Sequence, residues 1–495
     1  MRRAHEVAKV RAAEHELMAR LPDGTLMQRA AAGLAATCAR LLGRVYGKRV
    51  VVLAGSGDNG GDALYAAQRL TRRGARTFAV VTGSRIHERG AAALRGAGGR
   101  MAAVGDEAMR LIDGADLVID GMLGIGGRGG LRGPQAALAE RAASAGSMVV
   151  AVDLPSGIDA DTGAVEGTAV RADVTVTFGT YKPGLLIDPG ASHAGVVELI
   201  DIGLTGLAGP DVTALQSGDL AAMLPRPVAE SDKYRRGVVG VLAGSDKFTG
   251  AAVLAVGGAL RGGAGMIRYL ASPGVAGLVR QRWPEAVITV AEPPDDRGGA
   301  KDVVEETGRV QAWVAGPGMG TNDAAARLLA AVLGTDVPVL VDADGLTLLS
   351  EDRSLLRRDA PTLLTPHAGE LARLLGTERA DVEVRRLEHA RRAAAELGAT
   401  VLLKGSTTVI ASTDGPAWVN TMTTPWLATA GSGDVLSGLA GALLAQGMDT
   451  AVGAAAAAYV HGLAARLAAA GAPIGAGDVI AAIPEAFRTI RGEPS

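Results

Sequence analysis

The chain has 495 residues, 48% of them hydrophobic and 21% charged, and a formal net charge of −2. This composition is typical of a globular protein of two to three domains and excludes a disordered chain. The balanced charge indicates neither a nucleic-acid partner nor a membrane partner, and the single cysteine, Cys38, excludes an intramolecular disulfide.

Residues from about 5 to 45 are predicted to be helical, with a break at residues 21–25. Glu6, Glu14 and Glu16 interrupt this segment before any long apolar core, so we expect no secretory signal and a cytoplasmic protein. The most apolar stretch, residues 451–470, contains His461 and Arg466 and therefore predicts a packed helix rather than a membrane span.

From residue 49 onward, short β-branched runs alternate with alanine-rich helical stretches. The runs of the first half are 49–53, 77–81, 116–119, 148–152 and 174–178, and those of the second half are 237–242, 312–315, 337–341 and 400–403. Continuous apolar runs that alternate with helices indicate parallel sheets covered on both faces. The pattern lapses between about 205 and 236, so we predict an α/β protein with two three-layer domains, residues 1–215 and 216–495.

A glycine-rich segment, residues 55–62, follows the first predicted strand and leads into a helix. Its glycines permit a tight turn and allow a phosphate to approach backbone N–H groups. Gly55, Gly57 and Gly60 also match the dinucleotide fingerprint, but the second strand ends at residues 80–83 without the acidic residue that would hold a ribose. Hydride-transfer chemistry is therefore disfavoured.

Polar groups also follow two further strands of the first half, at Asp120 and Asp153. Because the carboxyl ends of parallel strands share one edge, we expect these residues to meet Asn59 above the sheet. Asn59, Asp120 and Ser156 supply oxygen ligands suited to a hard cation, although each of them could instead serve as a cap or turn former.

These segments resemble the NAD(P)H-hydrate epimerase family, in the strings 57–62, 120–124 and 153–157 and more loosely in 26–30. The resemblance implies a Rossmann-like domain in which Asn59, Asp120 and Ser156 bind K⁺. It implies that Asp153 contacts the hydrated cofactor. Because a carboxylate at a semi-enclosed strand end can take and return a proton, Asp153 is also our candidate for the acid/base at C6 of the hydrated nicotinamide. The other cofactor contacts that it implies are Asp58, Asn59, Gly60, Gly61, Asp62, Gly124, Ile125, Gly126, Gly127, Arg128, Gly129 and Gly130.

One departure from the family pattern is Asp58, where asparagine is usual. An added negative charge beside a pyrophosphate weakens binding unless a cation or Arg128 offsets it. We therefore expect reduced epimerase activity, and a purely binding role for the first half remains an alternative.

The sharpest motif of the second half is residues 429–438, where small residues precede an apolar helix with Asp434 in its first turn. Backbone N–H groups of residues 431–434 would form an anion hole for a phosphate, assisted by the helix dipole. Asp434 would then accept the proton of an attacking hydroxyl. Lys404 and the hydroxyls that follow it could hold nucleotide phosphates, although an exposed lysine in a hairpin is the alternative. His367 could be either a turn histidine or a ligand contact.

The motifs of the second half resemble the NAD(P)H-hydrate dehydratase branch of the ribokinase-like fold, including Gly244, Ser245 and residues 249–252. The resemblance implies ADP as phosphoryl donor, with Mg²⁺ on its phosphates, and Asp434 as the base that activates the C6 hydroxyl. The residues that it implies for the hydrated cofactor are Ala252, Gly318, His367 and Asp434. Those for the nucleotide are Lys404, Gly405, Ser406, Thr407, Thr408 and Gly433.

The resemblance covers nearly the whole chain and implies repair of hydrated NADH and NADPH (NADHX and NADPHX). The first domain would interconvert the R and S hydrates, and the second would dehydrate the S hydrate with ADP. We also expect a homo-oligomer. The alternative is an ATP-dependent kinase of a small vitamin alcohol with an N-terminal ligand-binding domain, since the same fold serves such kinases.

Overall fold

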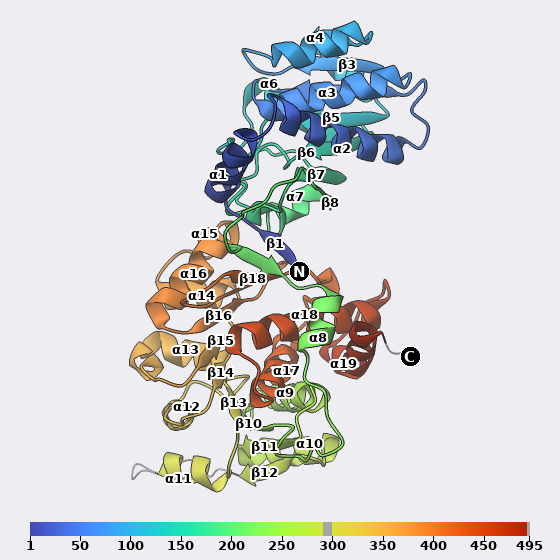
Figure 1. The fold of residues 1–495 in the computed structure, drawn as a ribbon. Coiled ribbons are helices and arrows are strands. Elements are labelled where there is room, and N and C mark those ends of the chain that lie inside the picture. Colours follow the sequence, from blue (N-terminus) through green and yellow to red (C-terminus); the bar gives the residue numbers. More distant parts are fainter. Residues whose placement is uncertain (291–298, 493–495) are drawn as a thin grey trace. The chain divides into compact units, whose positions relative to one another are not determined.

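The computed structural model describes residues 1–290 and 299–492. The chain divides into two compact units, which we call the N-terminal unit (Arg3–Val212) and the C-terminal unit (Met1–Arg2 with Thr213–Ser495). Both are layered α/β structures in which helices and strands alternate along the chain (Figure 1). The predicted α/β fold class is therefore confirmed.

The N-terminal unit contains a seven-stranded sheet of order β4-β3-β2-β5-β6-β7-β8, in which all neighbouring strands are parallel. Its strands are β2 (Arg49–Ala54), β3 (Arg76–Val81), β4 (Arg100–Ala103), β5 (Leu117–Gly121), β6 (Met148–Val152), β7 (Val174–Phe178) and β8 (Val196–Ile200). Its helices are α1 (Val7–Met18), α2 (Thr25–Leu42), α3 (Asp58–Arg72), α4 (Glu88–Gly96), α5 (Asp106–Asp113), α6 (Gly133–Ser144) and α7 (Ala191–Ala194), with a 3-10 turn at Pro183–Leu185.

Strand β2 shows why both faces of this sheet are covered. Val50 and Val52 belong to the core formed with α2 and α3, whereas Val51 and Leu53 belong to the core formed with α5 and α6. Successive side chains of a strand point to opposite faces, so a continuous apolar run buries both. The strand order reverses between β2 and β5. A ligand crevice is therefore expected beyond the carboxyl ends of these two strands.

The C-terminal unit is built on a sheet whose order is β1-β9-β18-β17-β16-β15-β14-β13-β10-β11-β12. Its strands are β10 (Val238–Leu242), β11 (Met266–Ala271), β12 (Val287–Val290), β13 (Ala312–Ala315), β14 (Val339–Val341), β15 (Thr362–Leu364), β16 (Thr400–Leu403), β17 (Thr408–Ala411) and β18 (Ala417–Asn420), together with β1 (Arg2–Ala4) and β9 (Val212–Ala214), the two strands within which the chain passes from one unit to the other. Its helices are α8 (Ser217–Met223), α9 (Thr249–Arg261), α10 (Pro273–Arg282), α11 (Gly299–Glu306), α12 (Asp323–Leu333), α13 (Asp344–Glu351), α14 (Ala368–Leu375), α15 (Arg379–Val384), α16 (Arg386–Leu397), α17 (Ser432–Ala445), α18 (Thr450–Ala469) and α19 (Ala476–Arg491), with 3-10 turns at Arg353–Leu356 and Pro425–Leu427.

Strands β10 to β16 are parallel, but β17 and β18 are antiparallel to their neighbours. This differs from the purely parallel sheet that the sequence pattern predicts. Four residues, 404–407, connect β16 to β17, and a parallel crossover needs a dozen or more. The segment with Lys404 is therefore a hairpin turn at the carboxyl end of β16.

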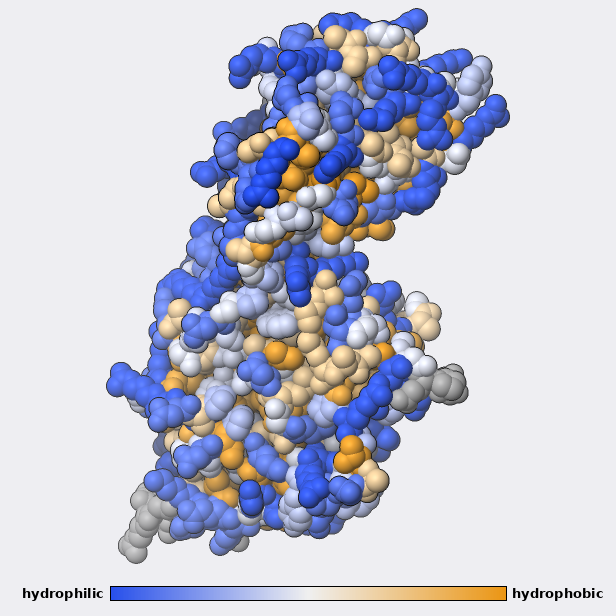
Figure 2. Space-filling model, in the orientation of Figure 1, coloured by the Kyte–Doolittle hydropathy of each residue, from blue (hydrophilic) through white to orange (hydrophobic). Residues whose placement is uncertain are grey.

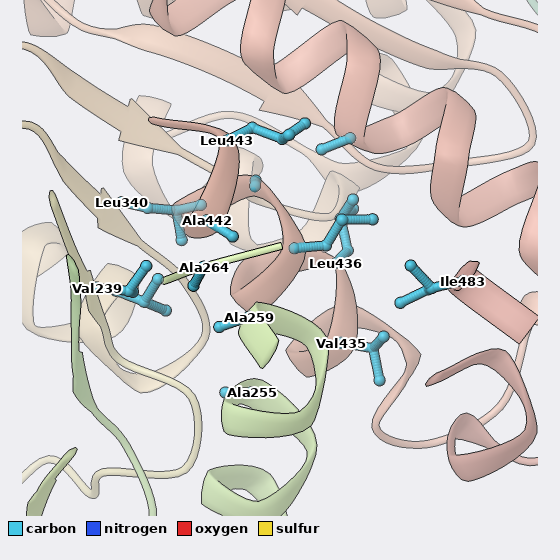
Figure 3. Close-up of a cluster of buried hydrophobic side chains, with 14 of the residues drawn as sticks. Val239, Ala255, Ala259, Ala264, Leu340, Val435, Leu436, Ala442, Leu443 and Ile483 are labelled. Atoms are coloured by element: carbon cyan, nitrogen blue, oxygen red, sulfur yellow. The ribbon is translucent and has the colours of Figure 1, made fainter. Parts of the chain in front are cut away.

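Small residues bring α17 close to α9. A Cβ atom on Gly438 would lie 1.9 Å from the carbonyl oxygen of Ala255, and one on Gly258 would lie 2.3 Å from that of Val435. Figure 3 shows Ala255 and Ala259 on α9, with Val435, Leu436 and Ala442 on the neighbouring α17. Close packing fixes helix positions strongly, so this contact holds the first turn of α17 in place.

Helix α18 packs against α17 and α19, as predicted for residues 451–470. Within the described ranges it is the one helix long and apolar enough to cross a bilayer, and 67% of its most apolar window is buried inside the protein. On the face drawn in Figure 2, hydrophilic residues are spread over both units, and each unit also shows patches of hydrophobic residues among the hydrophilic ones.

Candidate functional sites

Three strand ends of the N-terminal unit meet at Asn59, Asp120 and Ser156. Asp120 is fully buried near the end of β5. Its Oδ1 accepts a hydrogen bond from the Ser156 hydroxyl at 2.7 Å, and its Oδ2 accepts one from the Ser156 N–H at 2.8 Å. The Asn59 amide donates to the carbonyl oxygens of Leu123 at 3.1 Å and Val152 at 2.6 Å. The structure thus places the three residues predicted to bind K⁺ around the same pair of loops.

The donor set at this position fits a hard monovalent cation. Asp120 and Ser156 supply oxygens, and a Cβ atom on Gly124 would lie 2.5 Å from Oδ1 of Asn59, so that oxygen faces the glycine loop. Burial raises the pKa of Asp120 to about 6, although the hydrogen bonds from Ser156 and Met122 oppose this shift. A cation would offset the cost of burying that charge. Among the described residues, no group of three His, Cys, Asp or Glu side chains could hold a metal ion.

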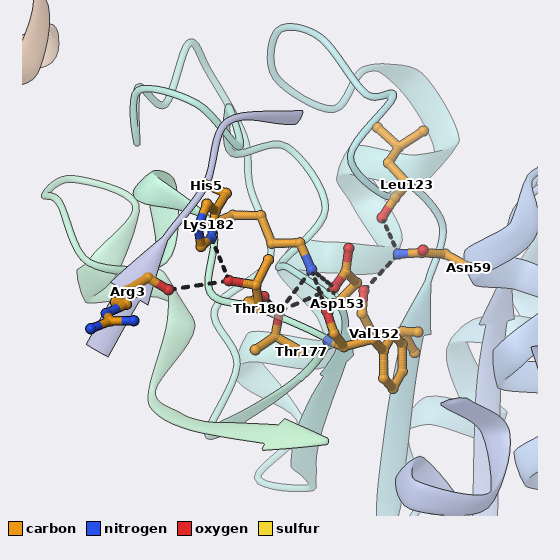
Figure 4. A network of polar contacts seen from close by, with 10 residues as sticks. Arg3, His5, Asn59, Leu123, Val152, Asp153, Thr177, Thr180 and Lys182 are labelled. Atoms are coloured by element: carbon orange, nitrogen blue, oxygen red, sulfur yellow. Dashed lines mark hydrogen bonds and ion pairs between the residues drawn. The ribbon is translucent and has the colours of Figure 1, made fainter. Parts of the chain in front are cut away.

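Asp153, which follows β6, forms an ion pair with Lys182, and both side chains are almost fully buried. Its Oδ1 also accepts hydrogen bonds from the Thr177 hydroxyl at 3.1 Å and the Phe178 N–H at 3.2 Å. Figure 4 shows the Lys182 side chain reaching toward this carboxylate. Asp153 has a φ of 65°, which is strained for a residue with a side chain. Such strain is common at functional sites.

The remaining residues predicted to contact the cofactor differ in exposure. Asp58 is exposed at the start of α3, whereas Gly60, Gly61 and Asp62, which follow it in the helix, are buried. A Cβ atom on Gly60 would meet the Gly55 carbonyl oxygen at 2.2 Å, so this turn requires glycine. The loop that follows β5 comprises Gly124, Ile125, Gly126, Gly127, Arg128, Gly129 and Gly130, and Arg128 is exposed on it.

A cavity of about 360 Å³ lies beside these elements in the N-terminal unit. It is lined by the segment joining α1 to α2, by residues of α3 that include Asp58 and Asp62, and by Phe178. Burial and the charges of Asp153, Asp58 and Glu14 raise the pKa of Asp62 well above its usual range. The cavity thus combines an apolar wall with acidic groups.

In the C-terminal unit, Asp434 lies in the first turn of α17, as the motif predicts. Gly431, with a φ of 85°, caps this helix, and a Cβ atom on Gly433 would lie 3.4 Å from Nζ of Lys404. Lys404 Nζ in turn lies 2.7 Å from Oδ1 of Asp342 and 3.9 Å from Oε2 of Glu370. The helix N-terminus and the hairpin lysine therefore face one space, as an anion-binding site requires.

The electrostatics of this space suit a general base. Burial and the charge of Asp342 raise the pKa of Asp434 to about 7; Lys404 opposes this shift and Asp344 adds to it. A carboxyl whose pKa lies near neutrality can accept a proton and release it again at physiological pH. Burial lowers the pKa of Lys404, but Asp342 and Glu370 outweigh that effect, so its pKa is raised. Lys404 therefore remains a cation.

The structure assigns different surroundings to the other residues predicted for this unit. His367 is the N-cap of α14, and its Nδ1 accepts hydrogen bonds from the N–H groups of Gly369 and Glu370. Ala252 is fully buried beneath Gly244, and Gly318, with a φ of 59°, packs against Phe248. Gly405 and Ser406 are exposed at the hairpin turn, Thr407 is buried and Thr408 begins β17. A second cavity, of about 240 Å³, lies beyond β10 and β11, beside Gly244 and Met319.

Sequence reasoning missed two residues that the structure brings into these sites. Lys182 pairs with Asp153 although the two are 29 positions apart in the chain. Its place after β7, among the other strand ends, is a signal that could have found it. Asp342, which follows β14, was given no role from the sequence, but it bridges Lys404 and the Ser437 hydroxyl, at 2.7 Å from each.

Two protein-family models match the chain. Residues 239–484 match the family described as NAD(P)H-hydrate dehydratase, and residues 23–184 match the YjeF-related protein N-terminus. Together they span both units.

A relative from Mycobacterium leprae, the bifunctional NAD(P)H-hydrate repair enzyme Nnr, is 49% identical over 485 residues, covering 97% of this chain and 96% of the relative. The solved ADP/ATP-dependent NAD(P)H-hydrate dehydratase of Bacillus subtilis, co-crystallised with ATP and Mg²⁺, is 32% identical with a TM-score of 0.50, covering 56% of this chain and 97% of the other. A ribokinase-like superfamily protein of Enterococcus faecalis is 25% identical with a TM-score of 0.51, covering 58% and 99%.

These findings confirm the predicted ribokinase-like fold and the predicted function, and they do not favour the vitamin-kinase alternative. Near-complete coverage of the chain, at almost half identity, is decisive for the family. The chain belongs to the family of bifunctional NAD(P)H-hydrate repair enzymes.

Proposed function

We propose that residues 1–215 interconvert the R and S hydrates of NADH and NADPH at C6, and that residues 216–495 dehydrate the S hydrate with ADP. The dehydratase activity is supported above all by Asp434. Its carboxyl has a pKa of about 7 and lies at a helix N-terminus beside Lys404. The matches to residues 23–184 and 239–484 support this division of activities.

In the proposed dehydration, Asp434 takes the proton of the C6 hydroxyl as that oxygen attacks the terminal phosphorus of ADP. The N–H groups at the start of α17 and the ammonium of Lys404 bind the phosphate. Loss of the phosphate from C6 and of a proton from C5 then restores the ring double bond. When bound, Mg²⁺ supplies charge neutralisation on the nucleotide phosphates.

Residue roles follow from these positions. We assign the nucleotide to Lys404, Gly405, Ser406, Thr407, Thr408 and Gly433, and the S hydrate to Ala252, Gly318, His367 and Asp434. The fully buried Ala252 can contribute only through its neighbouring backbone. Because Nδ1 of His367 is engaged in capping, we assign the contact with the hydrate to its Nε2, which also lies 3.4 Å from Oε1 of Glu370.

For the epimerase we propose Asp153 as acid/base and Asn59, Asp120 and Ser156 as K⁺ ligands. The fixed position of Asp153, held by Lys182 and Thr177, supports the first assignment. The shared oxygen donors around Asp120 support the second. A bound K⁺ would supply a positive charge beside Asp120. The cytoplasmic location and the homo-oligomeric state stay predictions from the sequence.

The test is recovery of the reduced-nicotinamide absorbance from a mixed-epimer NADPH hydrate, with purified protein, K⁺, Mg²⁺ and ADP. We expect complete recovery, at a rate above that of spontaneous epimerisation in a protein-free control. Recovery that stops at the fraction of the S epimer would leave the N-terminal unit with binding alone. No recovery with either ADP or ATP would contradict the dehydratase assignment.

A further inference from the structure

The geometry points to Asp62 as a second catalytic carboxyl of the epimerase site, one that delivers a proton to the C6 hydroxyl so that it leaves as water. This inference rests on the epimerase function proposed above. It gives Asp62 a chemical role distinct from that of Asp153, and it follows from the contrast between the two carboxyl groups.

Asp62 is a buried carboxyl group without full hydrogen bonding. The residue is 7% exposed, and its Oδ1 is buried with no hydrogen-bond partner among the described residues. Asp62 nevertheless lines the 360 Å³ cavity, in the company of Asp58 and Glu14. An ionised carboxylate in this position is costly, because no cation or N–H group satisfies that oxygen.

The neighbouring charges act in the same direction. Burial and repulsion from Asp153, Asp58 and Glu14 raise the pKa of Asp62 well above its usual range, which favours the protonated form of this carboxyl. Glu14, from α1, lines the same cavity, and burial raises its pKa too. The wall of this cavity thus carries a carboxylic acid that is ready to donate.

Asp153 has the opposite surroundings. The ammonium of Lys182, the hydroxyl of Thr177 and the N–H of Phe178 all point at its Oδ1. Phe178, whose N–H donates to Asp153, also lines the cavity, so Asp153 lies directly behind a residue of the wall that carries Asp62. Two carboxyl groups with opposed environments are a common arrangement for an acid and its paired base.

The proposed inversion passes through a planar cation with a C6=N1 double bond. Asp62 gives its proton to the C6 hydroxyl, the C6–O bond breaks, water leaves, and the lone pair of N1 forms a C6=N1 double bond. A water molecule then adds to the opposite face of the planar, cationic carbon, N1 regains its lone pair, and Asp153 takes the proton that the new oxygen loses. That proton returns to Asp62 through solvent, so the only net change is inversion at C6.

The first experiment compares Asp62→Asn with the native full-length protein. Conversion of purified R-NADPH hydrate to the S epimer is followed by chromatography, with K⁺ and without nucleotide. We expect kcat to fall about 100-fold or more, in the range of general acid catalysis, with KM changed less than threefold. Asp62→Glu, which keeps the carboxyl, should retain more activity than Asp62→Asn. Asp113→Asn removes an exposed carboxylate of the same unit and should leave kcat unchanged.

The second experiment uses the native protein alone, so it does not depend on how a variant folds. In ¹⁸O-labelled water, every enzymatic inversion should place ¹⁸O on C6 of the S epimer. Native turnover without ¹⁸O uptake, or full kcat in Asp62→Asn, would overturn the role of Asp62 while leaving the epimerase function standing. A native protein that does not epimerise at all would overturn both.

Discussion

The ammonium group of Lys404 lies 2.7 Å from Oδ1 of Asp342, a carboxylate that is 1% exposed. The other oxygen of Asp342 accepts a hydrogen bond from the Ser437 hydroxyl inside α17. Asp342 therefore connects the end of β14, the hairpin after β16 and the helix that carries Asp434. This link sets the position of Lys404 and, through its charge, the proton affinity of Asp434.

Removing Lys404 and removing Asp342 should shift the pH dependence of dehydration in opposite directions. Asp434 acts in its ionised form, so kcat for the S hydrate should rise with pH through about 7. Lys404→Met removes the cation that lowers the pKa of Asp434, and should move this rise to higher pH by roughly one unit. Asp342→Asn removes a repelling charge and should move it to lower pH. Profiles measured at saturating ADP and S hydrate test both shifts; a shared direction would contradict the assignment.

Asp434 should also lower the free energy of unfolding when the pH is above the acidic range. The unfolded chain releases the proton of this carboxyl near pH 4, whereas the folded state retains it until about pH 7. Unfolding is therefore favoured as pH rises from 4 to 7, after which the penalty stays constant. We expect Asp434→Asn to unfold at a higher temperature than the native protein at pH 8, with no difference near pH 4. Calorimetry at both pH values provides the measurement, and equal melting temperatures at pH 8 would refute the expectation. The same variant should lack dehydratase activity but bind ADP normally.

Breaking the Asp153–Lys182 pair should separate the two activities. Lys182→Met leaves a buried carboxylate without its cation, which typically costs about 3–5 kcal/mol. We expect loss of R-to-S conversion while ADP-dependent dehydration of purified S hydrate persists. Lys48→Met, which breaks the exposed pair with Asp116 at 2.8 Å, is the matched control and should cost about 1 kcal/mol or less. Denaturant unfolding gives both values, and equal losses would contradict the argument.

The cation site should respond to a single methyl group on the glycine loop. A Cβ atom on Gly124 would lie 2.5 Å from Oδ1 of Asn59 and must displace the amide. We therefore expect Gly124→Ala to raise the K⁺ concentration that half-activates epimerisation by about tenfold or more, equivalent to about 1.4 kcal/mol. A Cβ atom on Gly57 would have no neighbouring atom within 4 Å, and the φ of Gly57 is −95°. Gly57→Ala should leave the K⁺ response within about twofold, and a large effect there would remove the steric explanation.

Several parts of these sites could be predicted from the sequence because their signals are local. The runs 49–53 and 148–152 predicted strands β2 and β6, and the small residues before Asp434 predicted the start of α17. Asp120 and Asp153 were placed correctly at strand ends. The antiparallel pairing of β17 entered only as the alternative of a hairpin at Lys404, because the reversal depends on the length of the turn at residues 404–407 rather than on apolar periodicity.

The sequence by itself determined the α/β layering, the strand ends that carry polar groups, and the glycine turns at Gly60 and Gly431. Those features depend on residues close together in the chain. Only the tertiary structure decided that Lys182 pairs with Asp153, that Asp342 holds Lys404, and that Asp62 is buried without a full set of partners. Charge pairing and desolvation depend on segments that are distant in the chain and meet only after folding. For that reason the positions of the reactive groups could be read from the chain, but their protonation could not.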